Sequence, residues 1–225
     1  MCVGALINDD YLASYHIVTT ASCVTKYPMR KYNVKMVTYG STQQLKKISK
    51  IKVHPNYQNS REYNLALVQV NSNFDYWEAT TYQTIEVTGR RTYVLYLATP
   101  LSLIEVGDGL ARKRRECVDI YDKVGLAYEV GARMSCMTIN RRECTGPNGF
   151  LVIHDYRLVG IGVDGDKYCG DRYPYLWHAT YYYVGFLEQA AGWRSTNSVV
   201  QFAAINRSYS IFMLFMLINN VIYYY

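Results

Sequence analysis

Six cysteines are the residues of this sequence whose chemistry is easiest to constrain. Their spacings are long, and none form the C-x-x-C pairs of a zinc site or a redox motif. An even number at such spacings favours three disulfides and an oxidising compartment, although six cysteines allow many pairings. Six buried free thiols in a cytosolic protein are the alternative. The cysteines are Cys2, Cys23, Cys117, Cys136, Cys144 and Cys169.

Four histidines are the candidates for a general base, because imidazole exchanges a proton near neutral pH. His154 and His178 have no adjacent serine or cysteine that would act as a nucleophile. His16 precedes Ser22 by six residues, which along a strand is roughly 20 Å. His54 lies in a His-Pro segment. We expect all four to be surface residues or residues satisfied by structural contacts.

One run of basic residues is the strongest local charge feature, and it consists of Arg112, Lys113, Arg114 and Arg115. Such a run binds an anionic polymer or a membrane surface in some proteins and is a solvated surface loop in others. The formal net charge of +6 permits an acidic partner and does not require nucleic acid. We expect no nucleic-acid ligand, no metal ion and no cofactor.

The chain that must position these residues is globular in composition, since half of it is hydrophobic and no low-complexity segment interrupts it. Its 24 tyrosines, together with valine, isoleucine and threonine, favour strands. Many short strands at this spacing indicate an all-β barrel or sandwich. Runs of such residues between turn signals predict strands at 5–7, 17–20, 34–39, 48–53, 65–70, 92–98, 102–106, 149–154 and 158–163.

Helical periodicity is confined to two segments. Residues 114–123 predict a short helix or turn around Cys117. Residues 181–191 predict a helix with Val184 and Leu187 on one face, and Gly192 follows as a stop signal.

The segment 193–225 differs in character from the rest of the chain. Its first part is polar and contains an N-glycosylation sequon at Asn206. Residues 211–218 form an apolar run of eight, which is too short to span a bilayer as a helix. We expect a frayed or interface-seeking segment, and a membrane anchor of the GPI type is the alternative. No secretory signal follows Met1, so secretion implies a start further upstream or a truncated chain.

Five segments form a recognisable series: CVGALI at 2–7, VTTASC at 18–23, VHPNY at 53–57, YNLALV at 63–68 and CTGPNGFLV at 144–152. In this order they resemble the C-G-G-S-L-I, T-A-A-H-C, H-P-x-Y, D-I-A-L-I and C-x-G-D-S-G-G-P-L motifs of the trypsin-like serine peptidases. Residues 181–191 resemble the closing helix of that family. The resemblance covers residues 2–191 and includes all six cysteines.

The resemblance implies a chymotrypsin-like fold, in which two antiparallel β-barrels are followed by a C-terminal helix. The first barrel would occupy residues 1–89 and the second 90–192, with 193–225 as a tail. The family's first N-terminal strand is not found in the sequence, which would leave the first barrel with an unpaired edge or an edge that a partner covers. The family's pattern would pair Cys2 with Cys23, Cys117 with Cys136, and Cys144 with Cys169.

The positions that match the family's catalytic triad carry Ser22, Asn64 and Asn148. Acyl transfer needs a base that takes the proton of the nucleophile and a carboxylate that holds this base in its tautomer. Ser22 matches the base and cannot accept a proton near neutral pH. Asn64 matches the carboxylate and lacks its charge, and the amide of Asn148 is not nucleophilic. The resemblance therefore predicts that all three catalytic roles are lost.

The positions around the triad are altered as well. Pro147 replaces the aspartate that orders the oxyanion loop in the family, and Gly146 and Asn148 match the oxyanion hole. Tyr175 replaces a glycine and is expected to fill the specificity pocket. Arg142 matches the floor of that pocket. In a repurposed pocket it would bind an acidic group of a ligand, and beside a filled pocket it would turn to solvent. The former pocket positions are Arg142, Val163, Gly165 and Tyr175.

The predicted function is that of a non-catalytic serine-protease homologue, a pseudoprotease that binds a protein partner or regulates proteolysis. An active serine endopeptidase is the alternative that fold similarity alone suggests, and a decaying gene product without a selected role is a third. The disulfides and the sequon predict a secreted glycoprotein, with anchoring to a membrane by the tail as the alternative.

Overall fold

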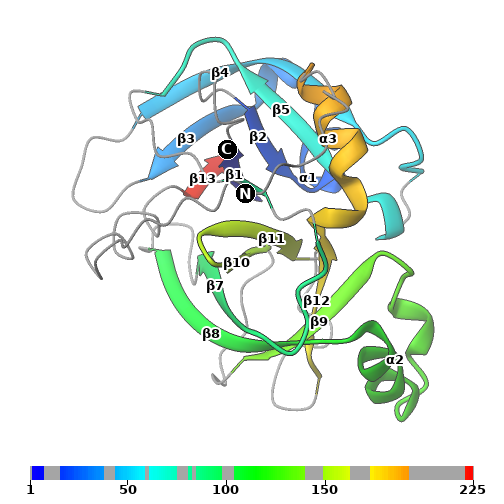
Figure 1. Ribbon diagram of the computed structural model, residues 1–225. Helices are drawn as coiled ribbons and strands as arrows, with labels where there is room; N and C mark the ends of the chain where they lie inside the picture. Colours follow the sequence, from blue (N-terminus) through cyan, green and yellow to red (C-terminus); the bar gives the residue numbers. More distant parts are fainter. Residues whose placement is uncertain are drawn as a thin grey trace, which may run out of the picture.

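A closed β-barrel and a seven-stranded sheet make up the computed structural model (Figure 1). It describes residues 2–7, 16–37, 44–58, 61–74, 81–82, 85–97, 104–139, 149–162, 173–192 and 221–224. In Figure 1 the closed barrel lies above the sheet, and helix α3 (Val184–Ala191) lies at the side of the upper barrel. The predicted all-β fold with a C-terminal helix is confirmed.

The N-terminal barrel closes in the order β1-β13-β3-β4-β5-β2, and each neighbouring pair is antiparallel. On β1, Leu6 packs into the core of this barrel, whereas Ala5 and Ile7 face the junction with the second sheet. This alternation follows from the two-residue period of a strand. The strands are β1 (Cys2–Ile7), β2 (His16–Thr19), β3 (Asn33–Val37), β4 (Gln44–Val53), β5 (Ala66–Val70) and β13 (Val221–Tyr224).

Strand β13 corrects one prediction made from the sequence. An unpaired edge was expected beside β1, but β13 lies between β1 and β3 and pairs with both. Tyr224 is opposite Cys2 on one side and Val34 on the other. The expectation is wrong because a segment far along the chain supplies the main-chain donors and acceptors that the edge lacked. The ends labelled N and C in Figure 1 consequently lie side by side.

The second sheet has the order β10-β7-β8-β9-β12-β11-β6, and an additional pairing joins β10 to β11. Six of its strands thus follow one another in a ring, which we call the C-terminal barrel. Phe150, Val152 and Trp177 are buried in its core. Its strands are β6 (Thr81–Tyr82), β7 (Arg91–Leu97), β8 (Ile104–Arg112), β9 (Met134–Ile139), β10 (Phe150–His154), β11 (Arg157–Gly162) and β12 (Tyr175–Ala179).

Helical elements are few and short. The two predicted helical segments are confirmed as α2 (Arg114–Asp122) and α3, and α1 (Ala21–Thr25) was not predicted. Gly192 ends α3 in the left-handed region with φ 77°, and its N–H bonds to the carbonyls of Glu188 and Gln189. Within the described residues no helix is long and apolar enough to cross a membrane. Single 3-10 turns are η1 (Met29–Lys31), η2 (Arg61–Tyr63), η3 (Ala127–Glu129) and η5 (Thr180–Tyr183).

An apolar core joins the two barrels. Leu65 and Leu67 lie in it from the N-terminal barrel, and Leu151 and Ile161 from the C-terminal barrel. Leu187 of α3 is fully buried in the same cluster, so the helix packs at the junction. Burial of this apolar area is the main contribution that holds the barrels together.

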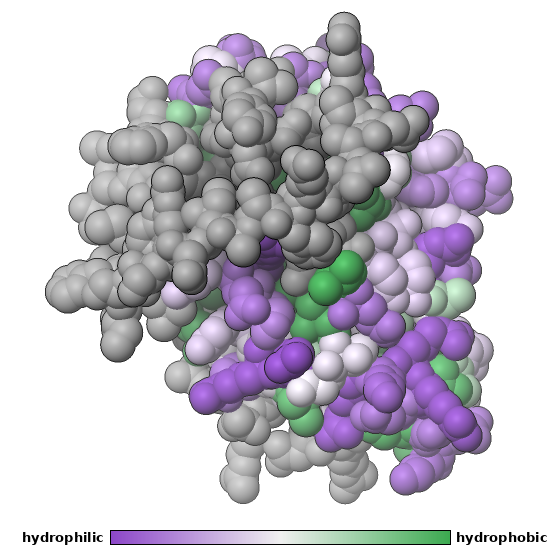
Figure 2. All heavy atoms as spheres, in the orientation of Figure 1, coloured by the Kyte–Doolittle hydropathy of each residue, from purple (hydrophilic) through white to green (hydrophobic). Residues whose placement is uncertain are grey.

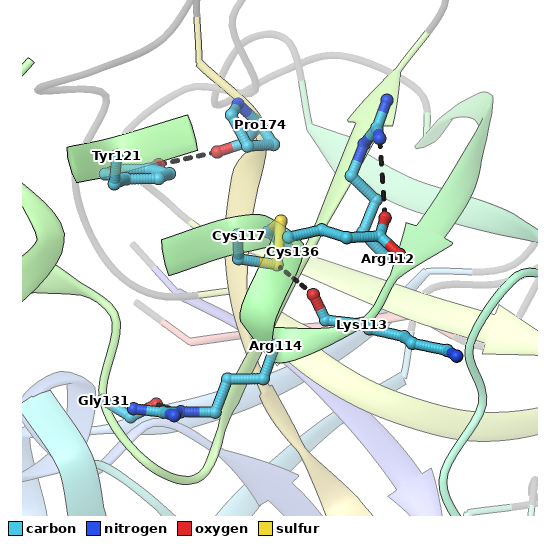
Figure 3. Close-up of a disulfide and its surroundings, with 9 residues drawn as sticks. Arg112, Lys113, Arg114, Cys117, Tyr121, Gly131, Cys136 and Pro174 are labelled. Atoms are coloured by element: carbon cyan, nitrogen blue, oxygen red, sulfur yellow. Dashed lines mark hydrogen bonds and ion pairs between the residues drawn. A yellow bond between two sulfur atoms is a disulfide. The ribbon is translucent and has the colours of Figure 1, made fainter. Parts of the chain in front are cut away.

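One disulfide is described completely. Cys117 of α2 bonds to Cys136 of β9, which confirms the pairing that the family resemblance implied (Figure 3). Tyr121, one turn further along α2, donates a hydrogen bond of 2.6 Å to the carbonyl of Pro174 and fixes the helix to the start of β12. Cys23 is also disulfide-bonded. The side chain of Cys2 and the pair Cys144–Cys169 lie outside the described residues.

Candidate functional site

Two of the three predicted triad positions, Ser22 and Asn64, are in direct contact. Ser22 lies in α1, directly after β2, and Asn64 lies between η2 and β5, which pairs with β2. The main-chain N–H of Ser22 donates to Oδ1 of Asn64 at 2.7 Å, and Nδ2 of Asn64 donates to Oγ of Ser22 at 3.0 Å. Asn64 is 4% exposed. The pairing of β2 with β5 therefore brings Ser22 and Asn64 together.

The hydrogen bonds continue from Ser22 through a chain of hydroxyl groups. Oγ of Ser22 donates to Oγ1 of Thr20 at 3.3 Å, and Oγ1 of Thr20 donates to Sγ of Cys23 at 2.9 Å. The amide, both hydroxyls and the bonded sulfur are all uncharged near neutral pH. This arrangement satisfies buried polar groups, but it offers no acceptor for a proton from a nucleophile.

Most of the other predicted site residues lie outside the described residues. The nucleophile position Asn148, the oxyanion position Gly146 and the neighbouring Pro147 lie outside the described residues. The same is true of three pocket positions, Arg142, Val163 and Gly165, and of the glycosylation sequon at Asn206.

Tyr175, the fourth pocket position, is described and packs against an aromatic neighbour. Its ring meets that of Phe150 edge to face, with centroids 5.7 Å apart, and Phe150 is 3% exposed. Gly162 makes room for this packing, because a Cβ there would lie 2.3 Å from Cδ1 of Phe150. The side chain at the predicted pocket position 175 is therefore in contact with a buried aromatic ring.

The histidines are held by structural contacts. His16 on β2 is buried, and desolvation, with a smaller contribution from the charge of Lys52, lowers its pKa to about 4. Burial lowers the pKa of His178 to about 3, and its Nδ1 lies 3.3 Å from the hydroxyl of Tyr183. Nδ1 of His154 lies 3.0 Å from the carbonyl of Arg91. His16 and His178 are therefore neutral over the physiological range.

An aromatic and ionic cluster, which the sequence did not reveal, lies beside Asn64. The ring of His54 stacks on Tyr63 with centroids 4.8 Å apart and meets Phe186 of α3 at 4.9 Å. Burial and the charge of Arg133 lower the pKa of His54. The guanidinium of Arg133 lies 4.6 Å from the centroid of the Tyr63 ring.

Arg133 also connects the two barrels. Its Nη1 is 3.2 Å from Oε1 of Glu62, which precedes Tyr63 in η2. The hydroxyl of Tyr183 donates to the main-chain carbonyl of Glu62, and burial raises the pKa of this phenol. The segment that carries Asn64 is thus fixed from both sides, by the C-terminal barrel and by η5. No motif in the sequence joins these residues, because their contacts depend on how the barrels pack.

Comparison with known proteins supports the resemblance in sequence over the first part of the chain. The family model described as Trypsin matches residues 1–94. No match was found among curated protein sequences.

Solved structures of similar fold include the scabies mite inactivated protease paralogue S-D1, with a TM-score of 0.68 and 13% identity over 85% of this chain and 92% of that chain. Kallikrein-related peptidase 10 has a TM-score of 0.68 and 19% identity, over 86% of this chain and 90% of that chain. Neuropsin, a serine protease of mouse brain, has a TM-score of 0.66 and 17% identity, over 84% of this chain and 88% of that chain. The shared fold therefore includes a protein described as inactivated as well as peptidases.

Proposed function

We propose that this chain, which is trypsin-like in its fold and in the sequence of its first 94 residues, is a non-catalytic homologue of serine peptidases that acts by binding a protein partner. The contact between Ser22 and Asn64 carries the proposal. The triad mechanism needs an imidazole and a carboxylate at these two positions, and here a hydroxyl and an amide bond to each other instead.

The exchange of side chains removes the proton transfer on which acyl transfer depends. An alkoxide cannot form at a neighbouring nucleophile unless a base takes its proton, and a serine hydroxyl is not a base near neutral pH. Two of the described histidines, His16 and His178, do not replace that base, because they are buried and their pKa values are lowered to about 4 and about 3. Loss of one triad member alone reduces turnover by roughly four orders of magnitude or more in peptidases of this type.

The retained scaffold supports a role in binding. The junction core is intact, and Arg133 and Tyr183 hold the segment before Asn64 in place. The aromatic contact between Tyr175 and Phe150 supports a filled rather than an open pocket. The Cys117–Cys136 disulfide fits the oxidising conditions outside the cytosol, and we propose that the protein is secreted.

A fluorophosphonate probe tests the loss of catalysis directly, because it forms a covalent adduct only with an activated serine. The purified, disulfide-bonded chain is incubated with the probe beside active trypsin, and adducts are counted by intact-protein mass spectrometry. We expect full labelling of trypsin and none of this chain. A stoichiometric adduct on any serine of the chain would overturn the proposal.

Binding is tested with the same preparation. The folded chain and a reduced, alkylated sample are immobilised and exposed to the fluid from which the protein is obtained, and retained proteins are identified by mass spectrometry. We expect a partner that binds the folded chain and not the unfolded one, with binding unchanged in the Ser22→Ala variant. If both samples retain the same proteins, the chain has no specific partner in that fluid and the binding role is rejected.

A further inference from the structure

The described parts of the two barrels differ in charge. In the described parts of the N-terminal barrel, residues 2–7, 16–37, 44–58, 61–74 and 221–224, there are nine lysines and arginines and one acidic residue, Glu62. The described residues 81–192 of the C-terminal barrel contain nine basic and nine acidic residues. Within these described residues, the N-terminal barrel therefore has an excess of eight basic residues, and the C-terminal barrel has none.

Strand β4 presents part of this charge to solvent. Ile48 and Ile51 pack against the core of the barrel, although they are three residues apart. The register of β4 against β5 shifts between Ile48 and Lys50, which changes the alternation of the strand. As a result, Lys47 and Lys50 are both exposed. At the rise of a strand, they are separated by about 10 Å along β4.

The turn η1 adds two further cations beside β4. Arg30 and Lys31 are exposed, and η1 contacts β4. Because β3 follows η1 at once and pairs Asn33 with Lys47, the antiparallel register places η1 near the Lys47–Lys50 segment. We call Arg30, Lys31, Lys47 and Lys50 the β4 surface. Hydrophilic side chains are visible at the upper edge of the molecule in Figure 2, where β4 lies in Figure 1.

No acidic side chain among the described residues neutralises the β4 surface. The ion pairs that the structure describes are Arg91–Asp108, Arg112–Glu116, Arg133–Glu62 and His154–Asp155, and none involves it. Glu62, the single described acid of the N-terminal barrel, is bonded to Arg133 of the other barrel. Four exposed cations in one region repel one another, and a bound polyanion removes that repulsion.

The basic run around α2 has a different setting. Arg112 pairs with Glu116 at 3.6 Å, and Arg114 donates to the carbonyl of Gly131 at 3.1 Å (Figure 3). The helix itself carries Glu116, Asp119 and Asp122. Part of the run is therefore engaged within the protein, and its charge is offset locally.

We propose that the β4 surface binds a linear sulfated polysaccharide. Cations that follow an extended strand match ligand charges that repeat along a chain, and sulfate groups stay ionised at every physiological pH. The disulfide is compatible with the oxidising compartments where such polymers occur, and the choice of ligand rests here on the secretion proposed above. The proposal goes beyond the binding function proposed above, because it uses none of the residues at the former catalytic positions.

Two matched double variants test the location of the site. Lys47→Glu with Lys50→Glu changes the β4 surface, and Arg115→Glu with Lys123→Glu changes exposed residues at α2 by the same net charge. Affinity for heparin is measured by calorimetry in physiological salt, and circular dichroism verifies the fold of each variant. We expect the β4 variant to bind at least about ten-fold more weakly and the α2 variant to remain within about three-fold of the unmodified chain.

Three outcomes would overturn the proposal: the unmodified chain does not bind heparin, both variants lose affinity equally, or the α2 variant loses more. A second measurement separates the ligand classes. Polyglutamate and vesicles that contain phosphatidylserine are compared with heparin at the same salt concentration. If either binds the unmodified chain as tightly as heparin, the surface recognises charge alone, and the assignment to a sulfated polysaccharide is wrong.

Discussion

Ser22 and Asn64 are joined by two hydrogen bonds of opposite direction, one from the main-chain N–H of Ser22 and one from the amide of Asn64. An aspartate at position 64 could only accept, so the asparagine suits a serine hydroxyl that also donates to Thr20. The two side chains therefore complement each other, and the pair contributes to stability.

Substitution of Asn64 should lower the free energy of unfolding more than substitution of Ser22. Asn64→Ala breaks both and leaves the Ser22 N–H without its partner, so we expect the free energy of unfolding to fall by about 2–3 kcal/mol. Ser22→Ala keeps the main-chain bond but removes the bonds of the hydroxyl to Asn64 and to Thr20, and it should cost about 1 kcal/mol. The double variant should lose less than the sum of the two single losses, because each single variant already breaks the bond between Nδ2 of Asn64 and Oγ of Ser22. Urea unfolding of all four proteins measures this, and additive losses would contradict the shared bond.

Acid should destabilise the protein through its buried histidines. The pKa of His16 is about 4 in the folded chain, against about 6.5 when unfolded. As the pH falls, the unfolded state therefore binds a proton at His16 before the folded state does. The contribution of His16 to the free energy of unfolding is complete above pH 6.5 and is lost as the pH falls towards 4. The loss for His16 is on the order of 3 kcal/mol.

The variant His16→Gln isolates this effect, because all carboxyl groups remain and their contributions cancel in the comparison. Urea unfolding between pH 7 and pH 4 should show a flatter pH dependence for the variant. Parallel curves for the two proteins would show that His16 does not titrate as described.

The aromatic wall at Tyr175 should be sensitive to a single methyl group. Gly162→Ala would place a Cβ 2.3 Å from Cδ1 of Phe150, and such overpacking costs about 1–3 kcal/mol. The three heavy atoms nearest to that Cβ all belong to the Phe150 ring, so the combination with Phe150→Leu should recover part of the loss. Gly185→Ala in α3 is the control, because nothing lies within 4 Å of its Cβ and alanine favours a helix. A loss in the combined variant equal to the sum of the single losses would argue against the contact.

Strand β13 should be necessary for the N-terminal barrel. It pairs on both sides, so Ile222→Pro removes a ladder hydrogen bond whichever neighbour the N–H of that residue faces. We expect a loss of about 3 kcal/mol or more. Hydrogen exchange should accelerate in β1 and β3 before it does in β5, whereas Ile222→Thr, which keeps the N–H, should leave the exchange pattern unchanged. Unaltered protection in β1 and β3 would show that the strand is dispensable.

Much of the fold could be predicted because runs rich in valine, leucine and isoleucine mark strands such as β5 and β11. Strand β9 was missed because Met134, Cys136 and Met137 carry no such signal. Strand β12 begins at Tyr175, which was considered only as part of the pocket. Strand β13 is four residues long, and its partners lie at the other end of the described chain, so only tertiary pairing defines it.

The site could be predicted only where a motif identified a position. The resemblance placed Ser22 and Asn64 at matching positions, but the bonds between them cross 42 residues of sequence and depend on β2 pairing with β5. The contacts of Arg133 with Glu62 and Tyr63 cross from one barrel to the other. Pattern and spacing contain no information on such contacts, because they arise from packing between units that are distant in the chain.

Closure of the N-terminal barrel by β13 also sets an order of events during synthesis. The first five strands of this barrel leave the ribosome well before Val221, which follows the whole C-terminal barrel in the sequence. Until then the edges of β1 and β3 face each other unpaired, and a nascent chain with unpaired strand edges is prone to aggregation. The first barrel to be translated is thus the last to be completed, and its maturation depends on prior synthesis of its neighbour.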